Sequence, residues 1–207
     1  MKIKNKKPNY TILTQNRKIK ETSILNNARV LSFNIPAAKT ESGKIVCPFA
    51  KDCLKYCYAN KGTYKYKSVQ KSYEYKYRLS KSEEFNTILQ SEIYKERPTH
   101  IRLHDSGDFY SVKYLQKWLK LAEENKDIIF YAYTKSVSFF KGLELPENFI
   151  IIFSEGGKRD NLINTETDRH ARIFKTSEEL TAAGYIDATK NDLNAIKENK
   201  KIGLLIH

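Results

Sequence analysis

The sequence predicts an α/β fold, specifically a partial (β/α) barrel of about six mainly parallel strands with helices outside. Three observations support this prediction. Short apolar runs alternate with amphipathic segments after residue 98, as in parallel sheets that are covered on both faces. Several of these runs end directly in small or charged residues, which is where (β/α) barrels and open α/β sheets build their sites. The number of apolar runs suits a partial barrel better than a complete eight-stranded one.

The first part of the chain divides into an arm, a strand, a cysteine-rich loop and two helices. Residues 1–28 are polar and basic, which predicts either a solvated tail or an arm that contacts nucleic acid. We place the domain boundary after this arm, so residues 29–207 form a single α/β domain with a cysteine-rich loop at residues 47–62. The first strand is predicted at residues 30–35, and helices are predicted at residues 64–80 and 82–95.

The rest of the chain alternates strands with helices. Ser111 can cap the helix that begins after it, because its hydroxyl can accept a hydrogen bond from a backbone N–H group of the first turn. Strands are predicted at residues 99–104, 128–133, 149–153, 170–174 and 201–207, and helices at residues 111–124, 136–143 and 191–199.

The composition narrows the classes of partner and compartment. The net charge of +13 and the pI of about 9.5 favour a polyanionic partner, above all nucleic acid, although a lysine-rich composition can also follow from codon usage. No apolar run is long enough to span a membrane, and residues 1–20 contain no apolar leader. We therefore expect a cytoplasmic protein that has no membrane partner.

All three cysteines fall in one short segment. Cys47, Cys53 and Cys57 have the spacing C-x5-C-x3-C within eleven residues. An odd number of cysteines and the lack of a secretory leader argue against a disulfide framework, so a metal ion or a metal cluster is the favoured function of the three thiolates. Two alternatives stay open, namely three small buried side chains and a single catalytic thiol.

The identity of the metal is also open at this point. Zinc prefers four protein ligands, and a histidine from elsewhere would have to complete the set of three thiolates. A [4Fe–4S] cluster normally takes four cysteines, and three would leave one iron open to another ligand. The three-cysteine loop suits the cluster at least as well as zinc. The candidate histidines are His100, His104, His170 and His207.

Polar residues at predicted strand ends define a second candidate site. Gly107 would let a ligand approach the backbone closely, while Asp105 and Asp108 offer carboxylates to an amine or a hydroxyl group. His104 could be a ligand, an acid–base group or a satisfied residue of the barrel. Two further residues would point toward the same rim, with loop solvation and helix capping as the alternatives: Lys135 and Glu155.

The predicted helix at residues 64–80 combines two stripes. Tyrosines and a valine recur at helical spacing along one stripe, and basic residues follow the other. Basic residues interleaved with aromatic ones can track a nucleic-acid backbone and stack on its bases. The alternative is an ordinary amphipathic helix with its tyrosines packed inward and its lysines solvated. The candidate nucleic-acid residues are Lys65, Lys67, Lys71, Tyr73 and Arg78.

Three motifs together resemble the "gene product 88" family of phages and mobile elements. They are Cys-Pro-x-Ala-x-x-Cys-x-x-x-Cys-Tyr-Ala, Ile-Arg-Leu-His-Asp-Ser-Gly-Asp-Phe and Tyr-Ala-Tyr-Thr-Lys-Ser. The resemblance covers roughly residues 31–157 and extends to the last residues of the chain. It implies a phage protein in the cytoplasm of the host cell. Many members carry a second cysteine group before the final strand, which residues 187–200 lack, so we expect no second metal site here.

A more distant similarity, to radical S-adenosylmethionine enzymes, bears on the chemistry. Those enzymes place three cysteines after the first strand of a partial (β/α) barrel and a Gly-Gly-Glu-like motif after the second strand. Here the three cysteines and the segment Ser106-Gly107-Asp108 hold the corresponding places, although the cysteine spacing differs from the usual C-x3-C-x2-C. The similarity implies an iron–sulfur cluster and a bound S-adenosylmethionine.

Two hypotheses of different class follow. The first is an iron–sulfur enzyme of radical-S-adenosylmethionine-like architecture that acts on nucleic acid, a host protein or another macromolecule. The second is a non-catalytic, zinc-stabilised protein that binds nucleic acid or counters host defence. In the enzyme hypothesis Asp108, Lys135 and Glu155 are catalytic, and the cofactor lies against His104, Asp105, Ser106, Gly107, Asp108 and Ser154.

Overall fold

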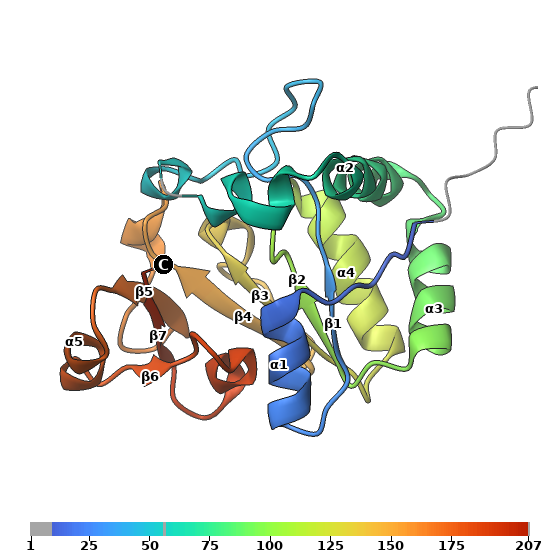
Figure 1. The fold of residues 1–207 in the computed structure, drawn as a ribbon. Helices are drawn as coiled ribbons and strands as arrows, with labels where there is room; N and C mark the ends of the chain where they lie inside the picture. The colour runs from blue at the N-terminus through green and yellow to red at the C-terminus, as the bar shows by residue number, and fades with distance from the viewer. Residues whose placement is uncertain (1–9, 56, 207) are drawn as a thin grey trace, which may run out of the picture.

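Seven parallel strands form one sheet that curls into a half barrel (Figure 1). The computed structural model describes residues 10–55 and 57–206. The strand order is β1-β2-β3-β4-β5-β7-β6, and every neighbouring pair is parallel. The strands are β1 (Val30–Phe33), β2 (His100–Leu103), β3 (Ile129–Thr134), β4 (Phe149–Ser154), β5 (His170–Phe174), β6 (Ile186–Asp187) and β7 (Lys201–Leu205).

The segments around and between the strands form five α-helices and six short 3₁₀ helices in the described residues. In this part of the chain no helix has the length and apolar character needed to cross a lipid bilayer. The α-helices are α1 (Arg17–Leu25), α2 (Lys67–Lys81), α3 (Phe85–Glu96), α4 (Val112–Glu124) and α5 (Ser177–Ala182), and the 3₁₀ helices are η1 (Asp52–Leu54), η2 (Tyr58–Asn60), η3 (Gly62–Lys65), η4 (Val137–Phe139), η5 (Asp160–Leu162) and η6 (Asp192–Ile196).

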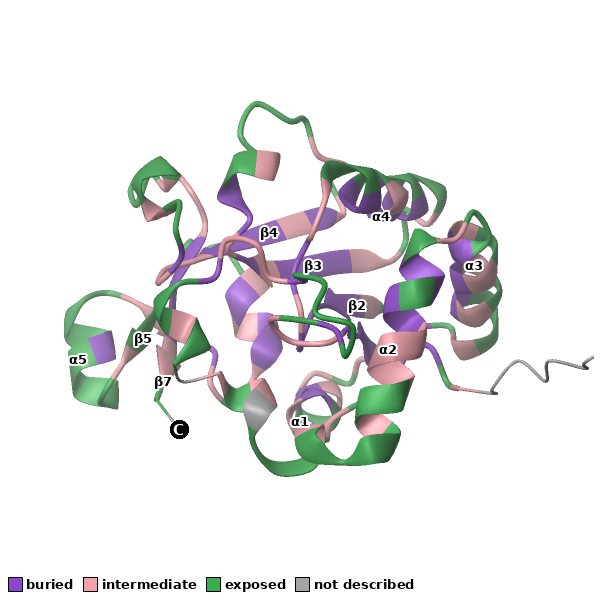
Figure 2. Cartoon of the chain, turned by 90° about the horizontal axis from the view of Figure 1, so that it is seen from above, coloured by how far each residue is buried: buried purple, intermediate pink, exposed green. Residues whose placement is uncertain are grey.

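One face of the sheet, which we call the outer face, packs against α3 and α4 and holds the larger apolar core. Phe33 of β1 contacts Phe85 of α3 and Trp118 of α4, with ring centroids 5.7 and 5.0 Å apart. All three rings are fully buried. Figure 2 shows the strands buried beneath helices whose other sides are exposed, as expected for a parallel sheet covered by amphipathic helices.

The opposite, inner face packs against α1 and η6. Ile19 of α1 and Leu193 of η6 join a smaller apolar cluster with Val30, Ile152 and Ile202 of the strands. This face also carries buried polar side chains on its central strands, among them Arg102 and Tyr131, so part of its interior is held by hydrogen bonds and ion pairs.

The structure confirms the predicted fold class and most of its elements. Seven strands replace the expected six, because β6 is only two residues long and leaves no periodic pattern in the sequence. The predicted helix at residues 111–124 is α4, and Ser111 Oγ accepts the capping hydrogen bond from Tyr114 N at 3.2 Å. Residues 136–143 and 191–199, predicted as helices, contain the single 3₁₀ helices η4 and η6.

Part of the predicted basic arm at residues 1–28 is a packed helix and not a solvated tail. Residues 17–25 form α1, which Asn16 caps by accepting a hydrogen bond from Ile19 N at 2.8 Å. Ile19 and Thr22 are fully buried against the inner face. The helix α1 is held in place largely by polar contacts, and Ile19 is its one buried apolar side chain. The sequence therefore shows no apolar periodicity from which this helix could be predicted. Residues 1–9 of the predicted arm lie outside the described residues.

Candidate cysteine-loop site

The cysteine loop, residues 47–62, lies over the carboxyl ends of the strands, an edge that we call the rim. Ala50 pairs with Gly157 in an isolated antiparallel bridge, and Lys158 N donates to Phe49 O at 2.8 Å. A third contact joins Asp52 N to a backbone oxygen of the same segment at 3.2 Å. These contacts fasten the loop to the chain that follows β4. The loop therefore begins after β1 and reaches β4 across the rim.

Cys47 shares its surroundings with the two other cysteines. Its Sγ accepts a hydrogen bond from Ala38 N at 3.3 Å. Burial raises the pKa of the Cys47 thiol, and the negative charges of Asp108, Cys57 and Cys53 raise it further. The cysteines are present as thiols rather than as a disulfide pair.

The three cysteines do not form a closed metal site among the described residues. One Zn²⁺ ion with bonds of about 2.3 Å would draw its thiolates to within about 4 Å of one another. Among the described residues, no group of three or more His, Cys, Asp or Glu side chains is gathered closely enough to hold a metal ion. An iron–sulfur cluster on the three cysteines therefore stays a prediction, as does zinc.

Asp105 ties the cysteine loop to the sheet. Tyr58, which follows the last cysteine, donates a hydrogen bond to the Asp105 carbonyl oxygen, and Tyr64 donates to Asp105 Oδ2. The Asp105 backbone N–H donates to Asn34 Oδ1 at 2.8 Å, and Asn16 Nδ2 donates to the carboxylate. Burial raises the pKa of both tyrosines, and the Asp105 charge adds to this, so both stay neutral hydrogen-bond donors.

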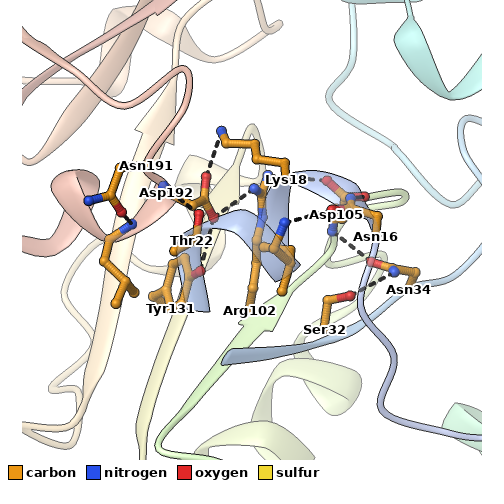
Figure 3. Close-up of polar contacts among 12 residues, drawn as sticks. Asn16, Lys18, Thr22, Ser32, Asn34, Arg102, Asp105, Tyr131, Asn191 and Asp192 are labelled. Atoms are coloured by element: carbon orange, nitrogen blue, oxygen red, sulfur yellow. Dashed lines mark hydrogen bonds and ion pairs between the residues drawn. The ribbon is translucent and has the colours of Figure 1, made fainter. Parts of the chain in front are cut away.

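The same network continues across the inner face (Figure 3). Arg102 lies between two carboxylates, with its Nη2 atom 3.7 Å from Asp105 Oδ1 and its Nη1 atom 2.7 Å from Asp192 Oδ2. Lys18 Nζ lies 2.8 Å from Asp192 Oδ1, and the Tyr131 hydroxyl donates to Asp192 Oδ2 at 2.9 Å. The cysteine loop, β2, α1 and η6 are thus joined through one buried polar network.

Asp108 joins the loop after β2 to the end of β3. Its Oδ1 accepts from Thr134 Oγ1 at 2.6 Å and from Phe109 N at 2.7 Å, and its Oδ2 accepts from Lys135 N at 3.0 Å. Burial raises the pKa of Asp108, while these hydrogen bonds oppose the rise. The carboxylate therefore has a clear structural role at the rim, and its catalytic role stays a prediction.

Ser106 and Gly107 pack against the chain that follows β1. Gly107 has a φ of 92°, and a Cβ atom there would lie 2.3 Å from Ile35 Cγ1. Ser106 O accepts from Ile35 N at 3.1 Å. Gly107 is closed on one side by Ile35, and both Asp108 oxygens accept hydrogen bonds from the protein, so this segment has a packing role here. Its predicted role toward S-adenosylmethionine stays a prediction.

His104 turns away from the rim. Its φ of 63° directs the ring toward the outer-face core, where it lies 4.6 Å from the Phe109 ring, and its Nε2 pairs with the Tyr114 hydroxyl at 2.9 Å. Burial, together with the nearby Arg102 charge, lowers the pKa of His104 to about 3. A neutral, buried imidazole agrees with the alternative of a barrel residue, although only Nε2 has a hydrogen-bond partner and the buried Nδ1 has none among the described residues.

Three other predicted site residues meet at the rim. Lys135 Nζ donates to Ser154 Oγ at 2.9 Å, to Ser154 O at 3.1 Å and to Glu155 O at 2.6 Å. The Glu155 side chain turns toward β5, where its Oε2 accepts from Arg172 Nε at 2.8 Å. The lysine thus holds the end of β4, and its ammonium group is surrounded by oxygen acceptors rather than directed at open solvent.

The predicted nucleic-acid residues separate into two environments. Lys65, Lys67, Lys71 and Arg78 are exposed along η3 and α2. Tyr73 is half-buried, and burial and the Asp105 charge raise the pKa of its phenol, which also makes a hydrogen bond with Asn34. The lysines are therefore available to a polyanion, whereas this tyrosine packs inward, as the amphipathic-helix alternative expects.

Sequence reasoning missed most of the residues that hold the loop in place. Tyr58, Tyr64 and Asp192 have no pattern that predicts their contacts, which cross between distant segments. Arg102 did give a signal. A charged side chain inside a short apolar strand almost always needs a buried counter-charge, so it should have predicted a partner on the inner face.

These features define an α/β half barrel whose rim is covered by a loop with three cysteines. The family model described as gene product 88 matches residues 4–207 of the chain. The protein therefore belongs to the gene product 88 family. The match gives no support to the more distant resemblance to radical S-adenosylmethionine enzymes. No curated protein and no solved structure matches the chain.

Proposed function

We propose that this protein holds an iron–sulfur cluster on Cys47, Cys53 and Cys57 and presents it at a basic face that binds nucleic acid. The observation that carries the proposal is the setting of the cysteine loop. Three cysteines lie within residues 39–81, where eleven Lys or Arg (of which Lys76 is buried) and three Asp or Glu give a net +8 of the chain's +13. A polyanion attracted to this face is brought to the thiols.

The residues around Cys47 favour a cationic ligand. Burial and the Asp108 charge raise the pKa of its thiol, so the group stays protonated unless a cation compensates the thiolate. The Ala38 N–H group already donates to the sulfur, and Tyr58 and Tyr64 hold the loop on Asp105. When bound, a cluster on three thiolates supplies electron transfer and one iron open to a further ligand.

The first experiment measures iron, zinc and acid-labile sulfide, together with the visible absorption spectrum, in protein purified without oxygen. We expect iron and sulfide in equal amounts and a brown chromophore. Cys53→Ser should lose most of both, whereas Ser91→Ala, an exposed change on α3, should retain them. Stoichiometric zinc without colour would replace the cluster by a zinc-stabilised binding protein. The absence of any metal would contradict both.

The nucleic-acid part of the proposal is tested by reversing charge. Lys67→Glu, Lys71→Glu and Arg78→Glu together should weaken binding of a single-stranded oligonucleotide and reduce the slope of log affinity against log salt by about 2–3. The matched control reverses three exposed lysines at and beyond α4, Lys113, Lys120 and Lys126, and changes the net charge equally. Equal effects of the two triple variants would show that net charge, and not this face, determines binding.

A further inference from the structure

A small cavity adjoins the cysteine loop, and none of its lining residues is a cysteine. It lies between the chain that follows β1, the turns η2 and η3, and α2, and its volume is about 250 Å³. Pockets for drug-sized ligands begin at about 300 Å³, so the space suits a single planar ring better than a whole nucleotide. Its lining includes Tyr64, Tyr73, Gln70, Glu74, Glu41 and Ser106.

Two tyrosines give the cavity fixed aromatic walls. The rings of Tyr64 and Tyr73 lie 6.4 Å apart at an interplanar angle of 58°. Their hydroxyls are committed inward, that of Tyr64 to the Asp105 carboxylate and that of Tyr73 to Asn34. Rings held in this way need little further ordering when a ligand binds, and base–aromatic stacking is a main source of single-strand affinity.

Carboxylates determine which ring can enter. Glu74 Oε1 accepts the backbone N–H of Glu41 at 2.6 Å, which holds the Glu74 carboxylate beside the cavity. An ionised carboxylate only accepts hydrogen bonds and therefore selects bases that present an amino group, as Asp and Glu do with cytosine. Thymine and uracil place two carbonyl oxygens beside their one ring N–H group, which a carboxylate repels.

Lysines lie on the elements that form the cavity. Lys39 lines the cavity, and Lys67 and Lys71 are exposed on the helix that supplies Gln70 and Glu74. Phosphates of a strand following these lysines would bring a base to the opening. A base paired inside a duplex cannot enter, because it must first leave its stack.

From these contacts we infer that the cavity binds one unpaired, amino-bearing nucleobase of a single-stranded polynucleotide. The inference rests on the proposed nucleic-acid function and deepens it by naming the strand state and the class of base. It predicts that affinity depends on base identity, which attraction of phosphates to lysines alone does not produce.

The test compares end-labelled oligo(dC), oligo(dT) and a duplex by fluorescence anisotropy at one salt concentration. The wild-type protein should bind oligo(dC) about tenfold more tightly than oligo(dT) and should bind the duplex more weakly than oligo(dC). Glu74→Gln should abolish the preference for oligo(dC) over oligo(dT) while it leaves the salt dependence unchanged, because the amide keeps the contact to Glu41 but no longer excludes carbonyl groups. Glu83→Gln, an exposed change of equal charge, is the control and should keep the preference.

The possible results distinguish the cavity inference from the proposed nucleic-acid binding. Oligonucleotide binding without base preference, or a preference that survives Glu74→Gln, would overturn the cavity inference and leave the proposed function standing. Failure of the wild-type protein to bind any of the three probes would overturn the nucleic-acid part of the proposed function and the inference with it. Loss of preference in Glu83→Gln as well would assign the effect to net charge and overturn the inference.

Discussion

At the scale of single residues, two carboxylates three positions apart serve different loops. Asp105 faces Arg102, and its carboxylate receives a hydrogen bond from Tyr64 just after the cysteine loop. Asp108 receives two hydrogen bonds from the end of β3 and one from Phe109 N. Gly107 makes this possible because its φ of 92° turns the chain between the two carboxylates, in a space that a Cβ would fill. The Ser-Gly-Asp segment is therefore a junction that fixes the rim.

At the scale of elements, α2 supports both proposals, but it also contains a destabilising residue. Lys76 is fully buried, and its Nζ has no hydrogen-bond partner among the described residues. Burial lowers the pKa of Lys76 to about 8, while Glu92 opposes this change. Nζ lies 5.7 Å from the centroid of the Tyr73 ring, which is a weak compensation for lost hydration.

Lys76→Met should therefore raise the free energy of unfolding at pH 7 by about 1–3 kcal/mol, since it removes a buried ammonium group and keeps most of the volume. Urea denaturation measures this change. Lys71→Met, at an exposed position of the same helix, should have almost no effect. Wild-type stability should also rise with pH between about 8 and 10.5, because the unfolded chain there holds a proton that the folded one has lost. A destabilised Lys76→Met variant would show that the ammonium group has a partner that matters.

How far the sequence predicts this structure depends on the range of the interactions. Alternating apolar runs and the Ser111 cap are local patterns, and they predicted the sheet and α4. The helix α1 was missed because its contacts, such as that of Asn16 to Asp105, join residues 89 positions apart. The position of the cysteine loop was predicted from the order of the elements, but its anchoring by tyrosines depends on side-chain geometry that no periodicity encodes.

At the scale of the whole molecule, one buried network links the two ends of the domain. Arg102 of β2, Lys18 of α1 and Tyr131 of β3 converge on Asp192 of η6. Burial alone would raise the pKa of Asp192, but the charges of Arg102 and Lys18 hold it below its usual range. The contribution of Asp192 to stability is therefore present above a pH of about 4 and is lost as the pH falls through the lowered pKa.

Asp192→Asn should lower the free energy of unfolding at pH 7 by about 3–5 kcal/mol, because it leaves the Arg102 guanidinium buried without its main counter-charge. Guanidinium chloride denaturation would measure the loss. The matched control is Glu166→Gln, which breaks an exposed ion pair with Lys201 at 3.8 Å and should cost less than about 1 kcal/mol. Because Arg102 also contacts Asp105, the Asp192 variant should loosen the cysteine loop. Proteolysis between residues 47 and 62 should then become faster at denaturant concentrations where the rest of the domain stays folded. If the variant instead unfolds in one transition and the loop is not cleaved earlier, the network stabilises the whole domain and has no separate effect on the cysteine loop.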